Sequence, residues 1–359
     1  MNKSVSVVKI AGAGIAGLTA AINLAKSGYN VEVFEKRADC GQRFHGDMQG
    51  IENWSRKIDV IQELKEINIE TNFDCTPFSN VTVTNTKIDE NFNFDRPLFY
   101  LVKRGNIENS LDQGLKKQAL SAGVKIYFNS TLSPDEADII ATGSKLEHAS
   151  IADRGIVFKT KMENTAVAII NGKLAHKGYS YLLVVDGYAC LCSCVFGETE
   201  TLTECFEKTK DYFVQKYNLE IIDPKPVGGI GYFTINNVWQ KENSRYVGEA
   251  AGLQDFLAGF GMRTAFRSGY LAAKSIIDDC DYADLVEKEY RKYLEAGIVN
   301  RYLWEHIKIG DHLRTIKRVS SLFHSVKNLR SAYNFNLAQR IKYKKAFNYI
   351  EEKYSVIIT

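Results

Sequence analysis

The sequence predicts an α/β fold, α+β overall, in which an antiparallel sheet is inserted into a parallel one and helices follow. Three observations predict it. Residues 6–37 read as strand, glycine turn, helix and second strand, which begins a parallel βαβ unit. Residues 155–196 hold short β-like runs separated by Asn-Gly and Asp-Gly turns. Residues 283–359 keep a helical spacing of apolar residues. A chain of 359 residues has room for two domains.

The turn of the first unit has the GxGxxG spacing, formed by Gly12, Gly14 and Gly17. In such a motif the first glycine permits a tight turn, the second lets the backbone approach a pyrophosphate, and the third lets the helix pack on the strand. The helix N-terminus adds free N–H groups and a partial positive charge. Glu35 follows Gly17 by eighteen residues and can accept hydrogen bonds from an adenosine ribose. The stretch predicts a dinucleotide site; an ordinary βαβ unit with chance glycines is the alternative.

The next segment, residues 36–54, is long, polar and glycine-bearing, so we expect a functional loop. Its notable members are Arg43, Phe44, His45 and Asp47. A guanidinium near a pyrophosphate is common chemistry, which favours Arg43. His45 is either a surface histidine or a proton donor.

Further elements follow in order, each from its periodicity or its turn residues. The sequence predicts an amphipathic helix over 54–68, with Ile58, Ile61, Leu64 and Ile67 on one face. It then predicts strands near 79–86 and 98–103, a helix over 105–123, a strand over 124–129, a strand over 138–141, a helix near 199–217, a strand near 229–236, and a strand into a turn at 245–249.

A second glycine turn precedes the last helix of this first part. Gly259 and Gly261 stand just before a helical pattern that runs to about Ile277. A helix N-terminus presented at a glycine turn is a second candidate site for negative charge. We therefore assign residues 1–150 plus 240–280 to a Rossmann-type domain, 151–239 to the inserted sheet domain, and 281–359 to a helical cap.

The charge distribution is uneven. The formal net charge is +3, but residues 301–359 carry twelve Lys/Arg against four Asp/Glu. The net charge by itself argues nothing about nucleic acid, and we expect no nucleic-acid partner. Two interpretations of the basic C-terminal helices stay open, a helical cap with a solvated basic face and a peripheral membrane contact. The apolar run at residues 5–25 is interrupted by Lys9 and Asn23, and no other run reaches the ~18 residues of a spanning helix. We expect a cytoplasmic protein.

Seven cysteines without a secretory pattern predict reduced thiols. Cys190, Cys192 and Cys194 alternate and would share one side of a strand. They are either buried strand cysteines or part of a metal site. Because no histidine or fourth cysteine stands at zinc spacing nearby, we expect no metal.

Three blocks together resemble a known family. They are GAGIAGLTAAINLAKSGYNVEVFEK at 12–36, ADIIATG at 137–143, and GEAAGLQDFLAGFGMRTAFRSGYLAA at 248–273. In this order they resemble FAD-dependent oxidoreductases of the p-hydroxybenzoate hydroxylase superfamily, and within it the geranylgeranyl reductase group. The resemblance covers about residues 5–277 and implies FAD as the cofactor.

The resemblance also implies roles for single residues. Gly12, Gly14, Ile15, Ala16 and Gly17 would cradle the pyrophosphate, and Glu35, followed by Lys36, would bind the adenosine ribose. Arg43, beside Phe44, would lie near the flavin-side phosphates, and Arg104 along the cofactor. Thr142 and Gly143 would pass the adenine half. Gly248 and Glu249 replace the family's Gly-Asp at the ribityl chain, and Gly259, Gly261 and Met262 would lie against the isoalloxazine.

Departures from the family's motifs narrow the range of reactions that we expect of this chain. The Asp-Gly motif of the aromatic hydroxylases is met only by Asp153-Arg154-Gly155. The paired tryptophans of flavin halogenases are missing, since Trp54, Trp239 and Trp304 stand apart. The prenyl reductases carry a Tyr-x-Trp-x-Phe-Pro motif, at whose place stand Tyr179 and Tyr181 without the Phe-Pro.

Our first hypothesis is an FAD-dependent reductase of C=C bonds in a hydrophobic, isoprenoid-like substrate or lipid. Its proton donor is not identified by the sequence; the candidates are His45, Tyr179 and Tyr181. The alternatives are a monooxygenase that acts through a flavin hydroperoxide and an FAD-binding module without turnover. The electron donor is open between NAD(P)H, which this superfamily often binds without a second fingerprint, and ferredoxin.

Overall fold

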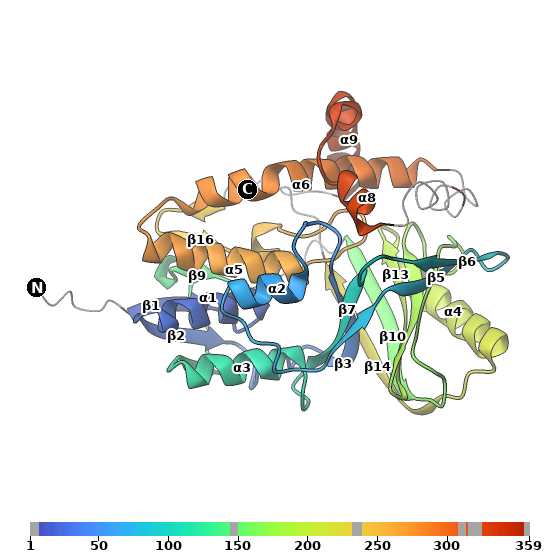
Figure 1. Cartoon of the computed structure of the whole chain (residues 1–359), viewed down its shortest axis with the longest axis horizontal. Coiled ribbons are helices and arrows are strands. Elements are labelled where there is room, and N and C mark those ends of the chain that lie inside the picture. The colour runs from blue at the N-terminus through green and yellow to red at the C-terminus, as the bar shows by residue number, and fades with distance from the viewer. Residues whose placement is uncertain (1–6, 144–149, 232–238, 308–313, 315–324, 355–359) are drawn as a thin grey trace, which may run out of the picture.

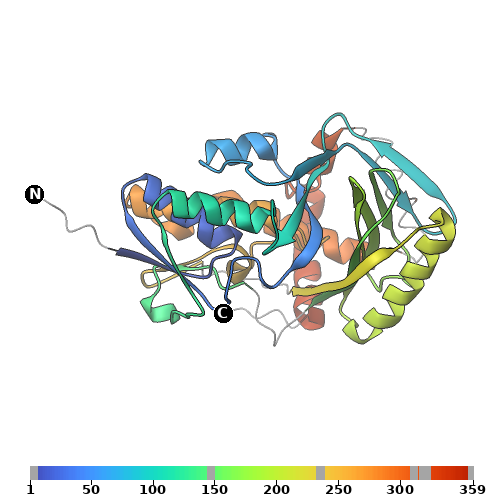
Figure 2. The same cartoon turned by 90° about the horizontal axis from the view of Figure 1, so that it is seen from below.

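A computed structural model of the chain describes residues 7–143, 150–231, 239–307, 314 and 325–354. Figure 1 shows a parallel sheet with its helices at one end of the molecule and an antiparallel sheet at the other. The long helix α6 (Tyr282–Glu305) runs over both. Figure 2 shows the same arrangement of the two sheets from below. This arrangement agrees with the α/β class expected from the sequence.

The first sheet contains the predicted dinucleotide unit. Its strand order is β15-β16-β9-β1-β2-β8, and all neighbours are parallel except β15 and β16. Its strands are β1 (Val7–Ala11), β2 (Asn30–Glu35), β8 (Lys125–Phe128), β9 (Ile139–Ile140), β15 (Gln240–Lys241) and β16 (Ser244–Tyr246). The apolar residues of β1 and β2 alternate in burial, which is the pattern of strands packed against helices.

Three helices pack together on this sheet. They are α1 (Ile15–Lys26), α3 (Leu111–Ser121) and α5 (Met262–Ile277). Helix α1 lies between the other two, and its Ala-rich sequence leaves little side-chain volume, so almost every residue of it is buried. The close approach of α1 and α5 depends on Gly269, where an added Cβ would lie 2.2 Å from the carbonyl oxygen of Ala16.

The second sheet has the order β14-β10-β13-β12-β11-β5-β6. Its strands are β5 (Asn80–Thr84), β6 (Asp89–Asn93), β10 (Ile151–Lys159), β11 (Thr165–Ile169), β12 (Tyr179–Val185), β13 (Tyr188–Phe196) and β14 (Ile222–Gly231). The antiparallel pairing predicted for 155–196 is confirmed. Helix α4 (Leu202–Tyr217) covers one face through Phe206 and Phe213.

Two strands of this sheet come from the first part of the chain. β5 pairs with β11 in parallel, and β6 pairs with β5, so residues 80–93 extend the sheet that we placed at 151–239. β14 begins at Ile222, earlier than the strand expected near 229–236, and residues 232–238 lie outside the described part of the chain. The sequence could not show this pairing, because it joins segments more than seventy residues apart.

A third, small sheet joins the two ends of the molecule. Its order is β3-β7-β4, with β3 (His45–Glu52), β7 (Phe99–Gly105) and β4 (Cys75–Phe78). Our expectation of a loop over all of 36–54 is therefore wrong in its second half. The polar composition of His45–Glu52 hid a strand, since antiparallel pairing with β7 satisfies its backbone regardless of side-chain hydropathy.

The helix expected over 54–68 is shorter than predicted. Helix α2 covers Val60–Glu66 only, and Asp59 caps it by accepting a hydrogen bond from the N–H of Ile61. Aspartate is among the preferred N-cap residues, because its carboxylate satisfies an N–H that has no partner within the helix. Helix α3 likewise begins late, at Leu111, behind the cap of Ser110.

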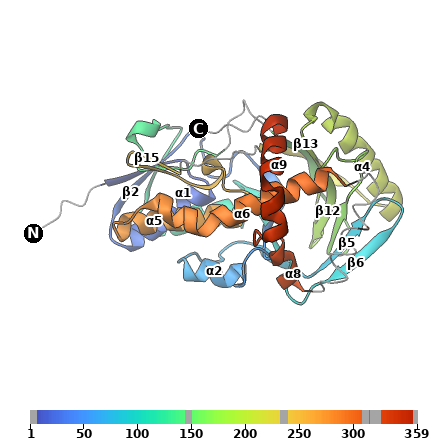
Figure 3. The same ribbon diagram turned by 90° about the horizontal axis from the view of Figure 1, so that it is seen from above.

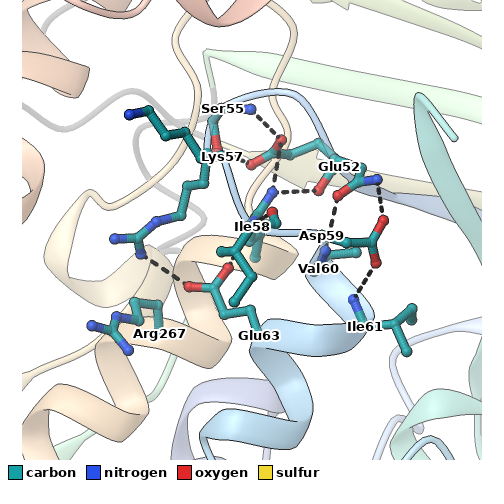
Figure 4. A network of polar contacts seen from close by, with 12 residues as sticks. Glu52, Ser55, Lys57, Ile58, Asp59, Val60, Ile61, Glu63 and Arg267 are labelled. Carbon is teal, nitrogen blue, oxygen red and sulfur yellow. Dashed lines mark hydrogen bonds and ion pairs between the residues drawn. The ribbon is translucent and has the colours of Figure 1, made fainter. Parts of the chain in front are cut away.

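Polar side chains among residues 52–59 bond to nearby backbone groups, and Figure 4 shows this network of contacts. The Asn53 side chain accepts from the N–H of Val60 at 2.9 Å and donates to Asp59 at 2.7 Å. The Glu52 carboxylate accepts from the N–H groups of Trp54 and Ser55. Side chains that bond to nearby backbone groups compete with helical hydrogen bonds, so the helix starts only after them.

The C-terminal region is helical in its described parts, as expected. After α6 come α8 (Val326–Ser331) and α9 (Leu337–Tyr354), while 308–313, 315–324 and 355–359 lie outside the described residues. Figure 3 shows α9 crossing α6. At this crossing Glu305 forms a buried ion pair with Arg301 at 2.7 Å and accepts hydrogen bonds from Tyr349, Lys353 and Tyr354.

One detail of α9 differs from its sequence pattern. Leu337, Ile341 and Phe347 stand at helical spacing in the sequence, but Leu337 is 73% exposed and Ile341 76% exposed. The helix instead buries Gln339, Ala346, Ile350 and Tyr354. In the part of the chain that is described, no helix is long and apolar enough to span a membrane.

Candidate functional site

One large cavity lies where the two main sheets face each other. Its volume is about 1160 Å³, and it is lined by the first glycine turn, the ends of β2 and β9, the N-terminus of α5 and the inner face of the antiparallel sheet. Ligand pockets commonly measure ~300–1,000 Å³. The cavity therefore has room for a dinucleotide and a second molecule.

The N-terminus of α1 opens into this cavity. Gly14 is its N-cap residue, with no side-chain cap, and no acidic residue occupies the first turn. An added Cβ at Gly14 would meet no heavy atom within 4 Å, so the space in front of the helix is open. Unsatisfied N–H groups and the helix dipole make this position suitable for a phosphate group.

The other two glycines of the motif are packing positions. An added Cβ at Gly12 would lie 2.4 Å from the carbonyl oxygen of Ala141, and φ at Gly12 is +102°, in the region that favours glycine. At Gly17 the Cβ would lie 2.0 Å from the carbonyl oxygen of Gly12. Gly17 does not line the cavity, in keeping with the helix-packing role of the third glycine.

Glu35 is held at the edge of the glycine turn by two backbone groups. Its carboxylate accepts from the N–H of Ala13 at 2.9 Å and from the N–H of Arg37 at 3.0 Å. Lys36 lines the cavity beside it. The carboxylate oxygens keep lone pairs beyond these two bonds, so Glu35 can accept hydroxyl groups of a ribose at this end.

Residues from three distant segments meet beside the turn. The guanidinium of Arg43 lies 3.7 Å from the Glu249 carboxylate, and an added Cβ at Gly143 would lie within 4 Å of both side chains. Thr142 and Gly248 line the same part of the cavity. The cluster brings together the ends of β2, β9 and β16, whose carboxyl ends share one edge of the parallel sheet.

Phe44 lies between two arginines. The Arg43 and Arg104 guanidinium carbons lie 4.7 Å and 4.2 Å from its ring centroid. Arg104 is buried and makes a two-pronged ion pair with Asp112, with both N–O distances at 2.9 Å. Asp112 and Gln49 thus fix the position of this guanidinium in the cavity wall.

The N-terminus of α5 is a second open helix end. Gly261 caps it without a side-chain bond, its first turn holds no acidic residue, and Gly259 has φ of +78°. Met262 lines the cavity, and the ring of Phe260 packs edge-on against Trp54 with centroids 4.8 Å apart. Two helix N-termini some 250 residues apart in the sequence thus open on one cavity.

The structure brings all the predicted cofactor-binding residues except Gly17 to the lining of this cavity. It does not bring His45 there, because that side chain is exposed at the start of β3 and is not part of the lining. Tyr179 and Tyr181 do line the cavity. The hydroxyl of Tyr179 donates to the carbonyl oxygen of Ala258 at 2.8 Å.

Two carboxylic acids in the cavity wall were not among our predicted site residues. Burial, and then the nearby Asp47 carboxylate, raise the pKa of Asp153 to about 6. Burial also raises the pKa of Asp47. A pKa displaced toward neutrality by burial and a like charge, in a cavity, is a frequent property of acid–base groups.

The sequence held a signal for Asp153. Ile151, Asp153, Gly155 and Val157 alternate along β10 and share one face of the sheet. The charged Asp153 therefore stands on a face where apolar residues are expected. Asp47 owes its place to a β-bulge in β3, where the register shifts between His45 and Met48. Bulges often re-aim a side chain next to an active site.

The far part of the cavity is apolar. It is lined by the β5–β7 region, the inner faces of β11 and β12, and α8. The apolar side chains there include Val81, Val83, Phe92, Phe94, Leu98, Phe99, Leu101, Ala168, Ile170, Leu183, Leu329 and Ala332. Such a wall suits a hydrophobic molecule.

The cysteines of β13 are buried, as the first of the two interpretations expected. Burial raises the pKa of Cys190 to about 12, and those of Cys192 and Cys194 well above the usual range, so all three are neutral thiols. Within the described residues no group of three or more His, Cys, Asp and Glu side chains is arranged to hold a metal ion.

Comparisons with known proteins agree with this architecture. The family model for the NAD(P)-binding Rossmann-like domain matches residues 10–58. No curated protein matches the chain. Among solved structures, a geranylgeranyl bacteriochlorophyll reductase-like protein from Thermoplasma acidophilum superposes with a TM-score of 0.65 at 16% identity, covering 98% of this chain and 96% of that one.

Two further structures carry other activities on the same fold. The flavin-dependent brominase Bmp2 has a TM-score of 0.67 at 15% identity, covering 97% of this chain and 99% of its own. A 2-methyl-3-hydroxypyridine-5-carboxylic acid oxygenase has a TM-score of 0.57 at 15% identity, covering 91% and 96%. The chain therefore has the fold of FAD-dependent oxidoreductases, a Rossmann-like domain with an antiparallel sheet and C-terminal helices. At these identities the likeness extends to the fold and leaves the reaction open.

Proposed function

We propose that this protein is an FAD-dependent oxidoreductase that reduces C=C bonds of a hydrophobic, isoprenoid-like substrate. The observation that carries the proposal is the single cavity into which two glycine-capped helix N-termini open and which continues into an apolar wall. The first property suits an extended dinucleotide, and the second suits an apolar substrate beside it.

FAD bound here would supply hydride chemistry at its ring. The α1 N-terminus at Gly14 would hold the pyrophosphate, and Glu35 the adenosine ribose. Arg43 and Glu249 would orient the chain between phosphates and ring. The N-terminus of α5 at Gly261 would place partial positive charge where the ring gains negative charge on reduction.

The apolar wall favours a hydrophobic substrate over a small polar aromatic. Leu98, Phe99, Leu183 and Ala168 offer van der Waals contact without hydrogen-bond partners. A site built from such residues binds long hydrocarbon chains better than ring hydroxyls or carboxylates, which would lose hydrogen bonds to water on entry.

The decisive experiment is mass spectrometry of lipids and quinones from cells that lack the protein. We expect isoprenoid species that are heavier in normal cells by the mass of two hydrogen atoms for each bond the protein reduces. Return of these species on expression of the wild type, and not of a variant without bound FAD, would identify substrate and chemistry together. An unchanged isoprenoid profile would contradict the proposal.

The monooxygenase alternative gives a different signature. After anaerobic reduction of the bound flavin, admitting O₂ would produce a long-lived hydroperoxide adduct and an oxygenated product. We expect rapid reoxidation without oxygen insertion. If no donor, NAD(P)H and ferredoxin included, reduces the bound flavin, the module without turnover is the better description.

We also propose that α9 contacts an anionic membrane surface. Leu337 and Ile341 are exposed on this helix among Arg340, Lys344 and Lys345, which are exposed as well. Apolar side chains can enter the headgroup region while basic neighbours meet anionic lipid, each basic residue contributing about 1 kcal/mol.

For this surface we expect the double variant Leu337→Ser/Ile341→Ser to bind anionic phosphatidylserine vesicles at least about tenfold more weakly, since each buried aliphatic side chain contributes ~1.5–3 kcal/mol. Vesicle co-sedimentation at low and high salt measures it. Leu120→Ser is the matched control, because Leu120 is also exposed but lies on α3. Equal binding by all variants would contradict the contact.

A further inference from the structure

A row of side chains crosses the inner face of the antiparallel sheet, in the wall of the cavity. Asp153 of β10 pairs in register with Cys194 of β13, which pairs with Tyr179 of β12. Residues directly opposite on neighbouring strands share a face. All three residues line the cavity, so Asp153 is placed at the wall on which a substrate would lie.

The fold makes room for this carboxyl group. On β14 its partner in register is Gly229, where an added Cβ would lie 2.9 Å from Asp153 Oδ1. On the other side the Cys192 thiol lies 3.6 Å from Asp153 Oδ2 and donates to it. A glycine and a small thiol thus leave a space on the sheet that the carboxyl group fills.

Among the described residues, the charged and titratable groups around Asp153 come from β3, the loop before it, β12 and β13. Asp47 of β3 repels its charge and Arg43, in the preceding loop, attracts it. The thiols of Cys190, Cys192 and Cys194 and the phenols of Tyr179 and Tyr181 are neutral, because burial raises the pKa of each. Among the described groups of this wall, the Asp153 carboxyl group therefore has a pKa, about 6, that lies close to neutral pH.

We infer that Asp153 is the general acid of the reaction, which delivers its proton to one carbon of the substrate double bond. The inference rests on the proposed reductase function. In the step, the O–H bond of Asp153 would break as a C–H bond forms at one carbon, and bound reduced flavin would supply the hydride for the C–H bond at the other. The double bond is reduced by two electrons, the flavin is oxidised, and the Asp153 carboxylate regains its proton from water.

The two tyrosines are weaker candidates for this role than the sequence suggested. The hydroxyl proton of Tyr179 is committed to the carbonyl oxygen of Ala258 at 2.8 Å. A phenol whose pKa lies well above its usual range is also a poor proton donor to carbon. The rings of Tyr179 and Tyr181 instead lie next to each other in the cavity wall, with their centroids 6.2 Å apart.

The test compares Asp153→Asn with wild type in single-turnover oxidation of the reduced, FAD-loaded enzyme by its substrate. General acid catalysis contributes ~10²–10⁴-fold, so we expect a rate lower by about 100-fold or more with little change in substrate affinity. A general acid must be protonated, so the wild-type rate should fall as pH rises above about 6, the pKa of Asp153. Asp153→Asn should lack this limb.

Two further variants separate position from structure. In Gly229→Ala the new methyl group presses on Asp153 Oδ1 without removing the acid, so we expect an intermediate rate that keeps the pH limb. The control is Asp223→Asn, which removes an exposed carboxylate from β14, the strand of Gly229. We expect its rate and pH profile to match wild type. An unchanged rate and pH profile in Asp153→Asn would overturn the inference while leaving the reductase function standing.

A second measurement does not depend on turnover. Infrared difference spectra of the unloaded protein, wild type minus Asp153→Asn, should contain a protonated carboxyl band that disappears with a midpoint near pH 6. Absence of the band over this range would also overturn the inference. If the band titrates but no olefin is reduced by the wild type, the proposed function fails and the inference fails with it.

Discussion

Gly14→Asp should remove FAD binding without harming the fold. The added Cβ meets no heavy atom within 4 Å, and φ of −83° at this position is ordinary for any residue. Aspartate is among the preferred N-cap residues, and an N-cap aspartate stabilises a helix by about a few tenths of a kcal/mol more than glycine does. The unloaded protein should therefore unfold at the same denaturant concentration as wild type, or slightly higher.

The new carboxylate would occupy the position that we propose for the phosphates in front of α1. Two like charges about 4 Å apart at an effective dielectric constant near 20 repel by ~4 kcal/mol. Each 1.4 kcal/mol is a tenfold change in affinity, so we expect about 1,000-fold weaker FAD binding. Equilibrium titration with flavin fluorescence measures it.

Gly14→Asn is the matched control, since it has the same shape and no charge. We expect it to lose at least about tenfold less affinity than Gly14→Asp, because only the steric part of the effect remains. If both variants bind FAD as wild type does, the pyrophosphate does not lie at the N-terminus of α1 and the proposed cofactor site is wrong.

Gly269→Ala should destabilise the first domain strongly. The Cβ would lie 2.2 Å from the carbonyl oxygen of Ala16 and 3.0 Å from its carbonyl carbon, both backbone atoms of α1. Because no side chain can rotate away, α1 and α5 must separate. Overpacking usually costs ~1–3 kcal/mol, and we expect a loss at the upper end, about 3 kcal/mol. Urea unfolding followed by circular dichroism measures the free energy.

The control for this substitution is Gly172→Ala. Gly172 lies in the turn between β11 and β12, and an added Cβ there meets nothing within 4 Å. Replacing a glycine in a compatible conformation stabilises proteins by ~0.4–1 kcal/mol, so we expect no loss. Equal stability of Gly269→Ala and wild type would mean that α1 and α5 do not pack at this distance.

The comparison of sequence and structure is clearest where local rules act alone. The strand Val7–Ala11 and the helix that ends at Lys26 follow from hydrophobic periodicity and glycine chemistry within thirty residues. The hairpin of β12 and β13 follows from the two-residue turn Asp186-Gly187. Local patterns determine these elements, because the residues that form each one lie close together in the chain.

Predictions failed where a strand partner or a capping side chain decides the conformation. The polar strand His45–Glu52 exists because β7 completes its hydrogen bonds. The start of α2 is delayed by Asn53, whose side chain holds Asp59 and Val60. Neither effect leaves a periodic trace, since pairing and side-chain capping depend on geometry more than on hydropathy.

The sequence by itself determined that a glycine turn, a helix and Glu35 come together on one βαβ unit, the arrangement expected of a dinucleotide site. Local spacing is enough for that, because the turn, the helix N-terminus and the strand end lie on one βαβ unit. Only the tertiary structure decided that Gly14 and Gly261 open on one cavity and that Asp153 stands in its wall among neutral thiols and phenols. Burial and the approach of Asp47 from another sheet set the acidity of Asp153, and both depend on contacts between segments that the sequence leaves far apart.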